Sequence, residues 1–229
     1  MLGGLLGLTW RSGFSRRTQE YLKFALGTFA VFLGVRLTWI SVNGPFLSIL
    51  RQLAVVVLAL LLGSLTGKLL RLQKASNNLG RHARERMAAA KSDAPNRFSD
   101  GFSTCALLFC VAPLATLGAV ADGLSGYYSP LIVKAVMDGL ATMGLVAVWG
   151  WGVTLAALPV FAYQGTLSLL VLRFAEPFLR EHGLVAAVNA TGGLLIFCVG
   201  LLIYEARRIE VANYLPSLIY APLLAWWLR

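Results

Sequence analysis

Residues 139–172 form an unbroken run without Asp, Glu, Lys, Arg or His, and similar apolar runs recur along most of the 229-residue chain. At about 1.5 Å per residue, this run would extend to roughly 50 Å as one helix, whereas the hydrocarbon core of a bilayer is about 30 Å thick. The run must therefore fold back on itself. Its middle carries Trp149-Gly150-Trp151-Gly152, where glycines permit a turn and tryptophans favour the membrane–water boundary. We predict one membrane span on each side of this turn.

The composition agrees with an integral membrane protein. Hydrophobic residues make up 58% of the chain and charged residues only 13%, whereas soluble domains carry about a quarter charged residues. The net charge of +10 comes from short basic clusters beside apolar runs, which is the positive-inside pattern and argues against a nucleic-acid partner. We place three clusters on the cytoplasmic side: Arg11 to Lys23, the basic loop 69–97 with Lys68 before it, and Arg207-Arg208.

The predicted fold is an all-α polytopic membrane protein with about eight spans. Ten residues of helix reach only about 15 Å, so the first span is a half-span or the true start lies upstream. Between the third and fourth spans, we expect a basic surface helix that ends before Pro95. The predicted spans are Met1–Trp10, Tyr21–Val42, Phe46–Lys68, Phe98–Ala121, Ser129–Val148, Val153–Leu172, Gly183–Tyr204 and Val211–Leu228.

Internal repetition divides this single transmembrane domain, residues 1–229. Spans three to five repeat as spans six to eight, and because three is odd, the second copy must enter the membrane from the opposite face. Such inverted repeats with broken helices are typical of secondary transporters. The alternative is a chance alignment of apolar helices of low complexity. Residues 1–62 form a partial repeat, residues 63–148 repeat one and residues 153–229 repeat two; the aligned segments are Gly63–Arg71 with Gly165–Arg173, Leu107–Val111 with Leu195–Val199, and Leu131-Ile132 with Leu218-Ile219.

Four ionisable side chains inside or at the ends of spans are candidates for function, because charges there are costly and usually functional. Lys134 and Asp138 are four residues apart on one predicted helix and can neutralise each other. They either bind or gate an ion, or form a self-satisfied pair that only packs against another helix. Asp100 opens the fourth span, where it can cap a helix or line a pathway. Asp122 near a helix end calls for a cation or Lys partner.

Uncharged polar residues beside helix breakers complete the predicted pathway. Amide side chains can hydrogen-bond to small solutes or coordinate ions without the cost of a buried charge, although they can equally form hydrogen bonds between helices. The pathway candidates are Gln164, Asn189, Thr191, Asn213 and Ser103. The predicted helix breaks are Pro113, Pro159, Gly192, Gly193 and Pro216.

The remaining patterns favour neither a metal nor a cofactor. Cys105, Cys110 and Cys198 are interpreted as apolar packing residues, because no Cys-x-x-Cys spacing or neighbouring His accompanies them. No nucleotide loop or nucleophile arrangement appears, so we predict that the protein is not an enzyme. The motifs Gly3-x-x-x-Gly7 and Gly63-x-x-x-Gly67 predict close helix approach, within the chain or in a homodimer.

A series of short motifs runs in a fixed order from Gly63 to the C-terminus. It comprises Asp100-Gly101-Phe102, Leu107–Val111, Gly118, Asp122-Gly123, Lys134 with Asp138-Gly139, Tyr163-Gln164-Gly165, Gly192-Gly193 and Asn213–Pro216. This order resembles a bacterial family of inner-membrane proteins, domain of unknown function 554, of the YqgA/YdfK type. The resemblance covers about two thirds of the chain and is looser in the N-terminal third. Ala112, Ala135 and Tyr127-Tyr128 depart from the Gly, Ser and Gly-Asp expected there.

The resemblance implies a location in the bacterial inner membrane and suggests transport without naming a substrate. Together with the predicted repeat, it favours a secondary transporter whose partners are the lipid bilayer and a small solute or ion. Two alternatives remain: an ion channel lined by the same polar groups, and a non-transporting scaffold or regulator that uses the basic loop.

Overall fold

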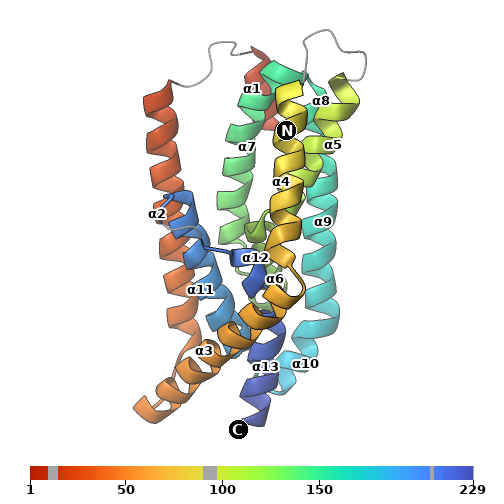
Figure 1. The fold of residues 1–229 in the computed structure, drawn as a ribbon. Helices are drawn as coiled ribbons and strands as arrows, with labels where there is room; N and C mark the ends of the chain where they lie inside the picture. The colour runs from red at the N-terminus through yellow and green to blue at the C-terminus, as the bar shows by residue number, and fades with distance from the viewer. Residues whose placement is uncertain (10–14, 90–96, 207–208, 229) are drawn as a thin grey trace.

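The computed structural model describes residues 1–9, 15–89, 97–206 and 209–228. Every secondary-structure element within these ranges is a helix (Figure 1). The all-α class is therefore confirmed. Arg11, Pro95 and the Arg207-Arg208 pair lie outside the described residues, so the predictions that involve them stay predictions.

The helices follow one another with short connections. Their bounds are α1 Leu2–Thr9, α2 Arg16–Ser41, α3 Phe46–Leu69, α4 Leu72–Ala89, α5 Arg97–Val111, α6 Pro113–Ser125, α7 Ser129–Trp149, α8 Gly152–Leu155, α9 Ala157–Leu170, the π-helix η1 Val171–Ala175, α10 Glu176–Glu181, α11 Val185–Ile203, α12 Val211–Tyr214 and α13 Ser217–Trp227. A helix does form in the basic loop, α4, whereas its place on the membrane surface stays a prediction.

Five helical segments in the described part of the chain are long and apolar enough to cross a bilayer. They are α2, α3, α7, α11 and the 30-residue stretch Gly152–Glu181, which joins α8 to α10; the bent pair α5 and α6 would be a sixth. The predicted first and last spans are shorter, since α1 has 8 residues and α12 and α13 have 4 and 11. The predicted count of eight spans is not confirmed.

The turn that splits the charge-free run lies where the sequence places it. Helix α7 ends at Trp149, and α8 begins at Gly152. Gly150 between them has φ +73°, a left-handed conformation that favours glycine.

Two of the predicted helix breaks occur. Pro113 begins α6 directly after α5, and the two helices meet at 58°, because a proline cannot donate to the Phe109 carbonyl four residues earlier. Pro216 lies between α12 and α13. The helix break predicted at Pro159 is not observed at that residue, which lies in the first turn of α9. The helix is interrupted only at Ala156, between α8 and α9.

Gly192 and Gly193 were predicted to break a helix, and this is wrong, because α11 runs unbroken through both. Gly193 serves instead as a point of close approach to α2. A Cβ atom on Gly34 of α2 would lie 2.6 Å from the Gly193 carbonyl oxygen, so neither position has room for a side chain.

The helices of the two predicted repeats run in opposite directions in Figure 1. Helices α3 and α7 rise in that view and α5 descends, whereas α9 and α13 descend and α11 rises. These directions are the ones that an inverted repeat requires. The repeat itself stays a prediction, because helix direction alone does not establish it.

Both glycine motifs are used within the chain. Gly3 and Gly7 of α1 pack against Gly139 and Met143 of α7, and Gly63 of α3 packs against Ser217 of α13. Small residues let helix backbones approach closely where lipid gives no hydrophobic driving force between helices. The motifs therefore supply no separate argument for a homodimer.

Candidate functional site

An ion pair is buried in the middle of α7. Lys134 donates to the Asp138 carboxylate one turn later; the lysine side chain is 3% exposed and the aspartate side chain 20%. The Lys134 ammonium also lies 5.5 Å from the centre of the Phe109 ring of α5, a distance at which cation–π attraction operates. The lysine is thus enclosed by protein, while the carboxylate keeps a partly open side.

The open side of Asp138 faces a cavity of about 530 Å³, called here the Asp138 cavity. Its walls come from α1, α7, α8 and α9, with Phe109 of α5 closing one side. The lining is mostly apolar: Met1, Leu2, Gly3, Phe109, Ala135, Asp138, Gly139, Thr142, Val153, Thr154, Ala157, Leu158, Val160, Phe161 and Gln164. Two predicted pathway residues, Asp138 and Gln164, therefore share one cavity.

Two polar atoms of the cavity lining are buried without a hydrogen-bond partner in the described part of the chain: Gln164 Nε2 and Thr154 Oγ1. An unpaired buried donor or acceptor costs about 1–3 kcal/mol, and most such groups in native proteins are paired. Thr142, in contrast, donates to the Asp138 backbone oxygen at 2.6 Å. The cavity therefore offers a carboxylate, an amide and a hydroxyl that a bound solute can satisfy.

Helix α1 is the part of this site that the sequence did not reveal. Met1, Leu2 and Gly3 line the cavity, and Gly3 contacts Gly139 directly. The sequence signal was the Gly3-x-x-x-Gly7 motif, which indicates a close helix neighbour without indicating which one.

Comparison with known proteins identifies the family of this chain. A family model described as protein of unknown function (DUF554) matches residues 1–226. The chain belongs to the DUF554 family. The match includes the N-terminal third, where the sequence motifs were looser.

Two relatives align with the DUF554 chain over nearly its whole length. It is 28% identical over 222 residues to "Uncharacterized membrane protein YdfK" of Bacillus subtilis (strain 168), covering 97% of this chain and 90% of that protein. It is 30% identical over 238 residues to "Uncharacterized protein YqgA" of Escherichia coli (strain K12), covering 99% and 93% respectively. No solved structure gives a significant match. The apolar helices and the first relative's name agree that this DUF554 protein is a membrane protein.

The structure places Asp122 and Asp100 away from the Asp138 cavity. Ser168 of α9 donates to the Asp122 carboxylate at 2.8 Å, so a hydroxyl takes the place of the predicted cation or Lys partner. Asp100, in the first turn of α5, forms an exposed ion pair with Arg86 of α4 at 2.9 Å. Ser103 on the same helix has only a long hydrogen bond, 3.4 Å, to the Asp100 backbone oxygen.

The other predicted polar residues do not line this cavity either. Asn213 connects α12 to α4: its Oδ1 accepts from Gln73 N at 2.9 Å, and its Nδ2 donates to Glu210 at 2.7 Å. Thr191 is fully buried and donates to Ala187 O of its own helix at 2.8 Å. Asn213 therefore ties α12 to α4, whereas Thr191 is satisfied within its own helix. Asn189 is different, because it is buried and its Oδ1 has no described partner.

Among the described residues, no group of three or more His, Cys, Asp or Glu side chains comes together as a metal site would require.

Proposed function

We propose that this DUF554 protein is a secondary transporter that moves a small solute coupled to a cation across the bacterial inner membrane. Asp138 is the titrating or cation-binding carboxylate, and Lys134 is its competing counter-charge. When a cation binds to Asp138, Lys134 loses its partner, and this exchange is the step that couples the cation to the solute. Gln164 and Thr154 supply hydrogen bonds to the solute.

The observation that carries the proposal is the buried pair opening onto a cavity with unpaired polar groups. A buried ion pair is weak evidence for stability, since apolar replacements of similar size are often equally stable. Ionisable groups within membrane helices usually mark ion or substrate pathways. A carboxylate that is 20% exposed in an otherwise enclosed pair fits that role better than pure packing does.

The proposed topology follows the charge pattern. The basic loop 69–97 lies on the cytoplasmic side, as the positive-inside rule requires, and the inverted repeats meet near the midplane. The partners proposed are the bilayer and the solute, without nucleic acid. We propose no enzymatic activity for this chain.

The test begins with purified protein in detergent. Its thermal stability is measured against sodium, potassium and magnesium chloride and a panel of small metabolites at constant ionic strength, because a ligand that binds the folded state raises apparent stability. The compound that gives a saturable shift is then used, radiolabelled, for uptake into proteoliposomes under imposed cation gradients. Saturable, gradient-driven uptake distinguishes a carrier from a channel.

The decisive variant is Asp138→Asn, with Asp100→Asn as a matched control outside the cavity. We expect Asp138→Asn to abolish coupled uptake and Asp100→Asn to retain it. The double variant Lys134→Met/Asp138→Asn serves as a second folded protein without the carboxylate. Wild-type uptake by either variant that lacks the Asp138 carboxylate would refute the assignment.

A second candidate function rests on α4. Its Lys74, Arg81 and Arg86 side chains are exposed, and a basic helix of this kind attracts anionic lipid or an acidic protein. Replacing these three residues with Gln separates the two functions: a scaffold loses its activity, whereas a transporter is only modulated.

A further inference from the structure

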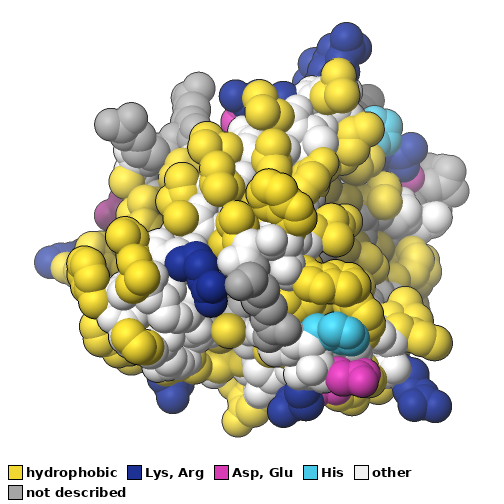
Figure 2. Space-filling view, turned by 90° about the horizontal axis from the view of Figure 1, so that it is seen from below, with side chains coloured by type: hydrophobic (Ala, Val, Ile, Leu, Met, Phe, Trp, Pro, Cys, Tyr) yellow, Lys and Arg dark blue, Asp and Glu magenta, His cyan; other side chains and the backbone are white. Residues whose placement is uncertain are grey.

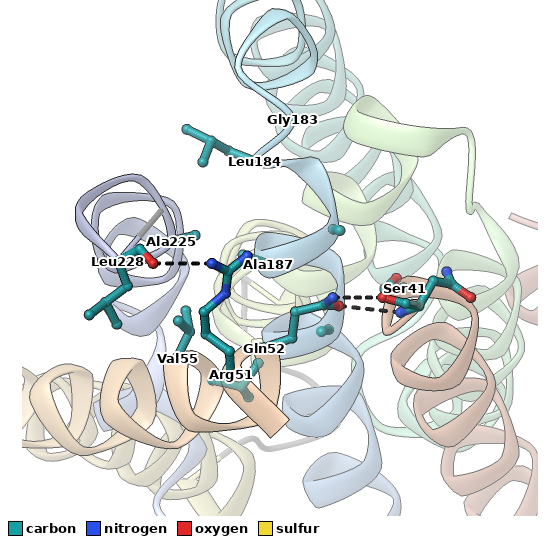
Figure 3. A pocket seen from close by; sticks show the side chains of 13 residues that line it. Ser41, Arg51, Gln52, Val55, Gly183, Leu184, Ala187, Ala225 and Leu228 are labelled. Carbon is teal, nitrogen blue, oxygen red and sulfur yellow. Dashed lines mark hydrogen bonds between the residues drawn. The ribbon is translucent and has the colours of Figure 1, made fainter. Parts of the chain in front are cut away.

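A second crevice is lined by Asn43, Gly183 and Leu228, at the end of the bundle where Figure 1 places the C-terminus. It consists of a pocket of about 270 Å³ between α3, α11 and α13, shown in Figure 3, and an adjoining hollow of about 310 Å³. The two share Ser41, Asn43 and Ala186, and together they are called here the Arg51 crevice. Viewed from that end, hydrophobic side chains cover much of the face, with Lys and Arg at its rim and also near its centre (Figure 2).

The crevice is electropositive. Arg51 of α3 points across the pocket toward the Leu228 backbone oxygen, beside Ala187 (Figure 3). Its Nη1 donates to that oxygen at 3.4 Å, a long hydrogen bond that leaves other guanidinium N–H groups available. None of the described lining residues is acidic.

The first turn of α11 adds donors to the same place. Helix α11 has 19 residues and begins after Leu184, which gives no side-chain cap. In the described chain, the first backbone N–H that donates to the Leu184 carbonyl oxygen is that of Ala187, at 3.2 Å. Ala186, one residue earlier, lines the crevice. The N-terminus of a helix carries a partial positive charge of roughly half a unit and attracts anions.

A buried amide lies at the inner end of the crevice. Asn189 is 7% exposed, its Oδ1 has no partner among the described residues, and the side chain lines the adjoining hollow. Thr191, two residues later, is satisfied within its own helix. The Asn189 Oδ1 is an acceptor, so a ligand that reaches Asn189 satisfies it only through a hydroxyl or N–H group, whereas a carboxylate, which only accepts, is held at the Arg51 end of the crevice.

The Arg51 crevice also occupies the place that the Asp138 cavity occupies in the other predicted repeat. The alignment that pairs Gly63 with Gly165 makes four lining residues of one cavity equivalent to four of the other. In order, Arg51, Gln52, Val55 and Val56 correspond to Val153, Thr154, Ala157 and Leu158. The alignment that pairs Leu131-Ile132 with Leu218-Ile219 makes Ala225 of the crevice equivalent to Asp138.

We propose that the Arg51 crevice binds a small organic carboxylate, and that it is the repeat-related counterpart of the Asp138 cavity at the other end of the bundle. Arg51 holds the carboxylate, the first turn of α11 adds backbone donors, and the walls of Val55, Val56 and Leu184 take a short apolar tail. The solute of the transporter is then an organic anion, moved together with the cation at Asp138; this last step rests on the proposed function, whereas the binding site does not.

Sodium benzoate is the probe, titrated calorimetrically into detergent-purified protein with sodium chloride held at constant ionic strength. We expect saturable binding to the wild type. Arg51→Gln weakens it roughly 10–100-fold, because a charge-assisted hydrogen bond contributes about 1.5–3 kcal/mol. Arg51→Lys keeps part of it, and Ala187→Phe, which fills the pocket, abolishes it. Arg180→Gln is the matched control, since Arg180 is exposed and paired with Glu176 at the same end of the bundle.

No saturable benzoate binding, or equal binding by the wild type and a folded Arg51→Gln variant, would overturn the site. Folding of each variant is checked by gel filtration and thermal unfolding. Counterflow of radiolabelled benzoate in proteoliposomes separates the two proposals. Binding that depends on Arg51 without any flux supports the site and overturns the carrier function, whereas flux that persists in Asp138→Asn overturns the cation coupling alone.

Discussion

Removing either member of the Lys134–Asp138 pair should destabilise the protein unequally. Asp138→Asn leaves the Lys134 ammonium uncompensated in a site where its side chain is 3% exposed. Breaking a buried pair in this way costs about 3–5 kcal/mol. Lys134→Met leaves the Asp138 carboxylate instead, which is 20% exposed and faces the cavity. Water in the cavity reduces the penalty there, so we expect about 1–3 kcal/mol.

The double variant Lys134→Met/Asp138→Asn removes both charges and should recover most of this loss. Replacing a buried pair by uncharged residues of similar size is often neutral or stabilising, so we expect it within about 1 kcal/mol of the wild type. Thermal unfolding followed by tryptophan fluorescence measures all four proteins. For a chain of this size, 1 kcal/mol corresponds to roughly 2–4 °C in Tm, so Asp138→Asn should unfold about 10 °C below the wild type.

The result that would refute this reasoning is a reversed order, with Lys134→Met less stable than Asp138→Asn. It would mean that the carboxylate is the more enclosed charge. A double variant as unstable as the sum of the single variants would show that the two side chains do not interact energetically. If the double variant recovers its stability but not its uptake, the Lys134–Asp138 pair is needed for function rather than for folding.

Two further predictions concern helix packing. Gly34→Leu should destabilise the protein by more than about 3 kcal/mol, because its side chain would meet the Gly193 backbone, whereas Gly80→Leu, where nothing lies within 4 Å, should not; thermal unfolding compares the two. Ser168→Ala should cost about 1–3 kcal/mol, since its single O–H lies within hydrogen-bond distance of both the Asp122 carboxylate, at 2.8 Å, and Ala119 O, at 3.0 Å. A Ser168→Ala protein as stable as the wild type would show that Asp122 is satisfied by water or another group.

Much of the fold could be predicted because the bilayer restricts what the chain can do. Charge-free length predicts where helices long enough to cross a bilayer form, although the predicted count of eight is not confirmed. The turn at Gly150 and the break at Pro113 follow from the backbone chemistry of glycine and proline. Gly192 and Gly193 were interpreted wrongly for a physical reason. Glycine favours both a helix break and close helix packing, and at Gly193 the presence of Gly34 opposite decides between them, whereas at Gly192 an added Cβ would meet only Leu218, at 3.7 Å.

The candidate site was only half predictable from the sequence. Lys134, Asp138 and Gln164 could be found, because charged and amide groups in apolar helices are conspicuous. Asp122 and Asp100 carry the same signal, yet the structure pairs them with Ser168 and Arg86 outside the cavity. Which polar groups converge depends on helix packing between distant segments, and residue types alone do not contain that information.

The difference between the Asp138 cavity and the Arg51 crevice is the one that the proposed transport function requires. If both repeats carried an aspartate at the equivalent position, the two carboxylates would compete for one cation, and the two states of the carrier would have no charge difference to exploit. Here Asp138 corresponds to Ala225, and Val153 corresponds to Arg51. In the predicted inverted repeat, the alignment makes the lining of one cavity equivalent to that of the other. The charged lining residue is acidic in the Asp138 cavity and basic in the Arg51 crevice, and in the proposed carrier this divergence gives the cation and the organic anion separate places to bind.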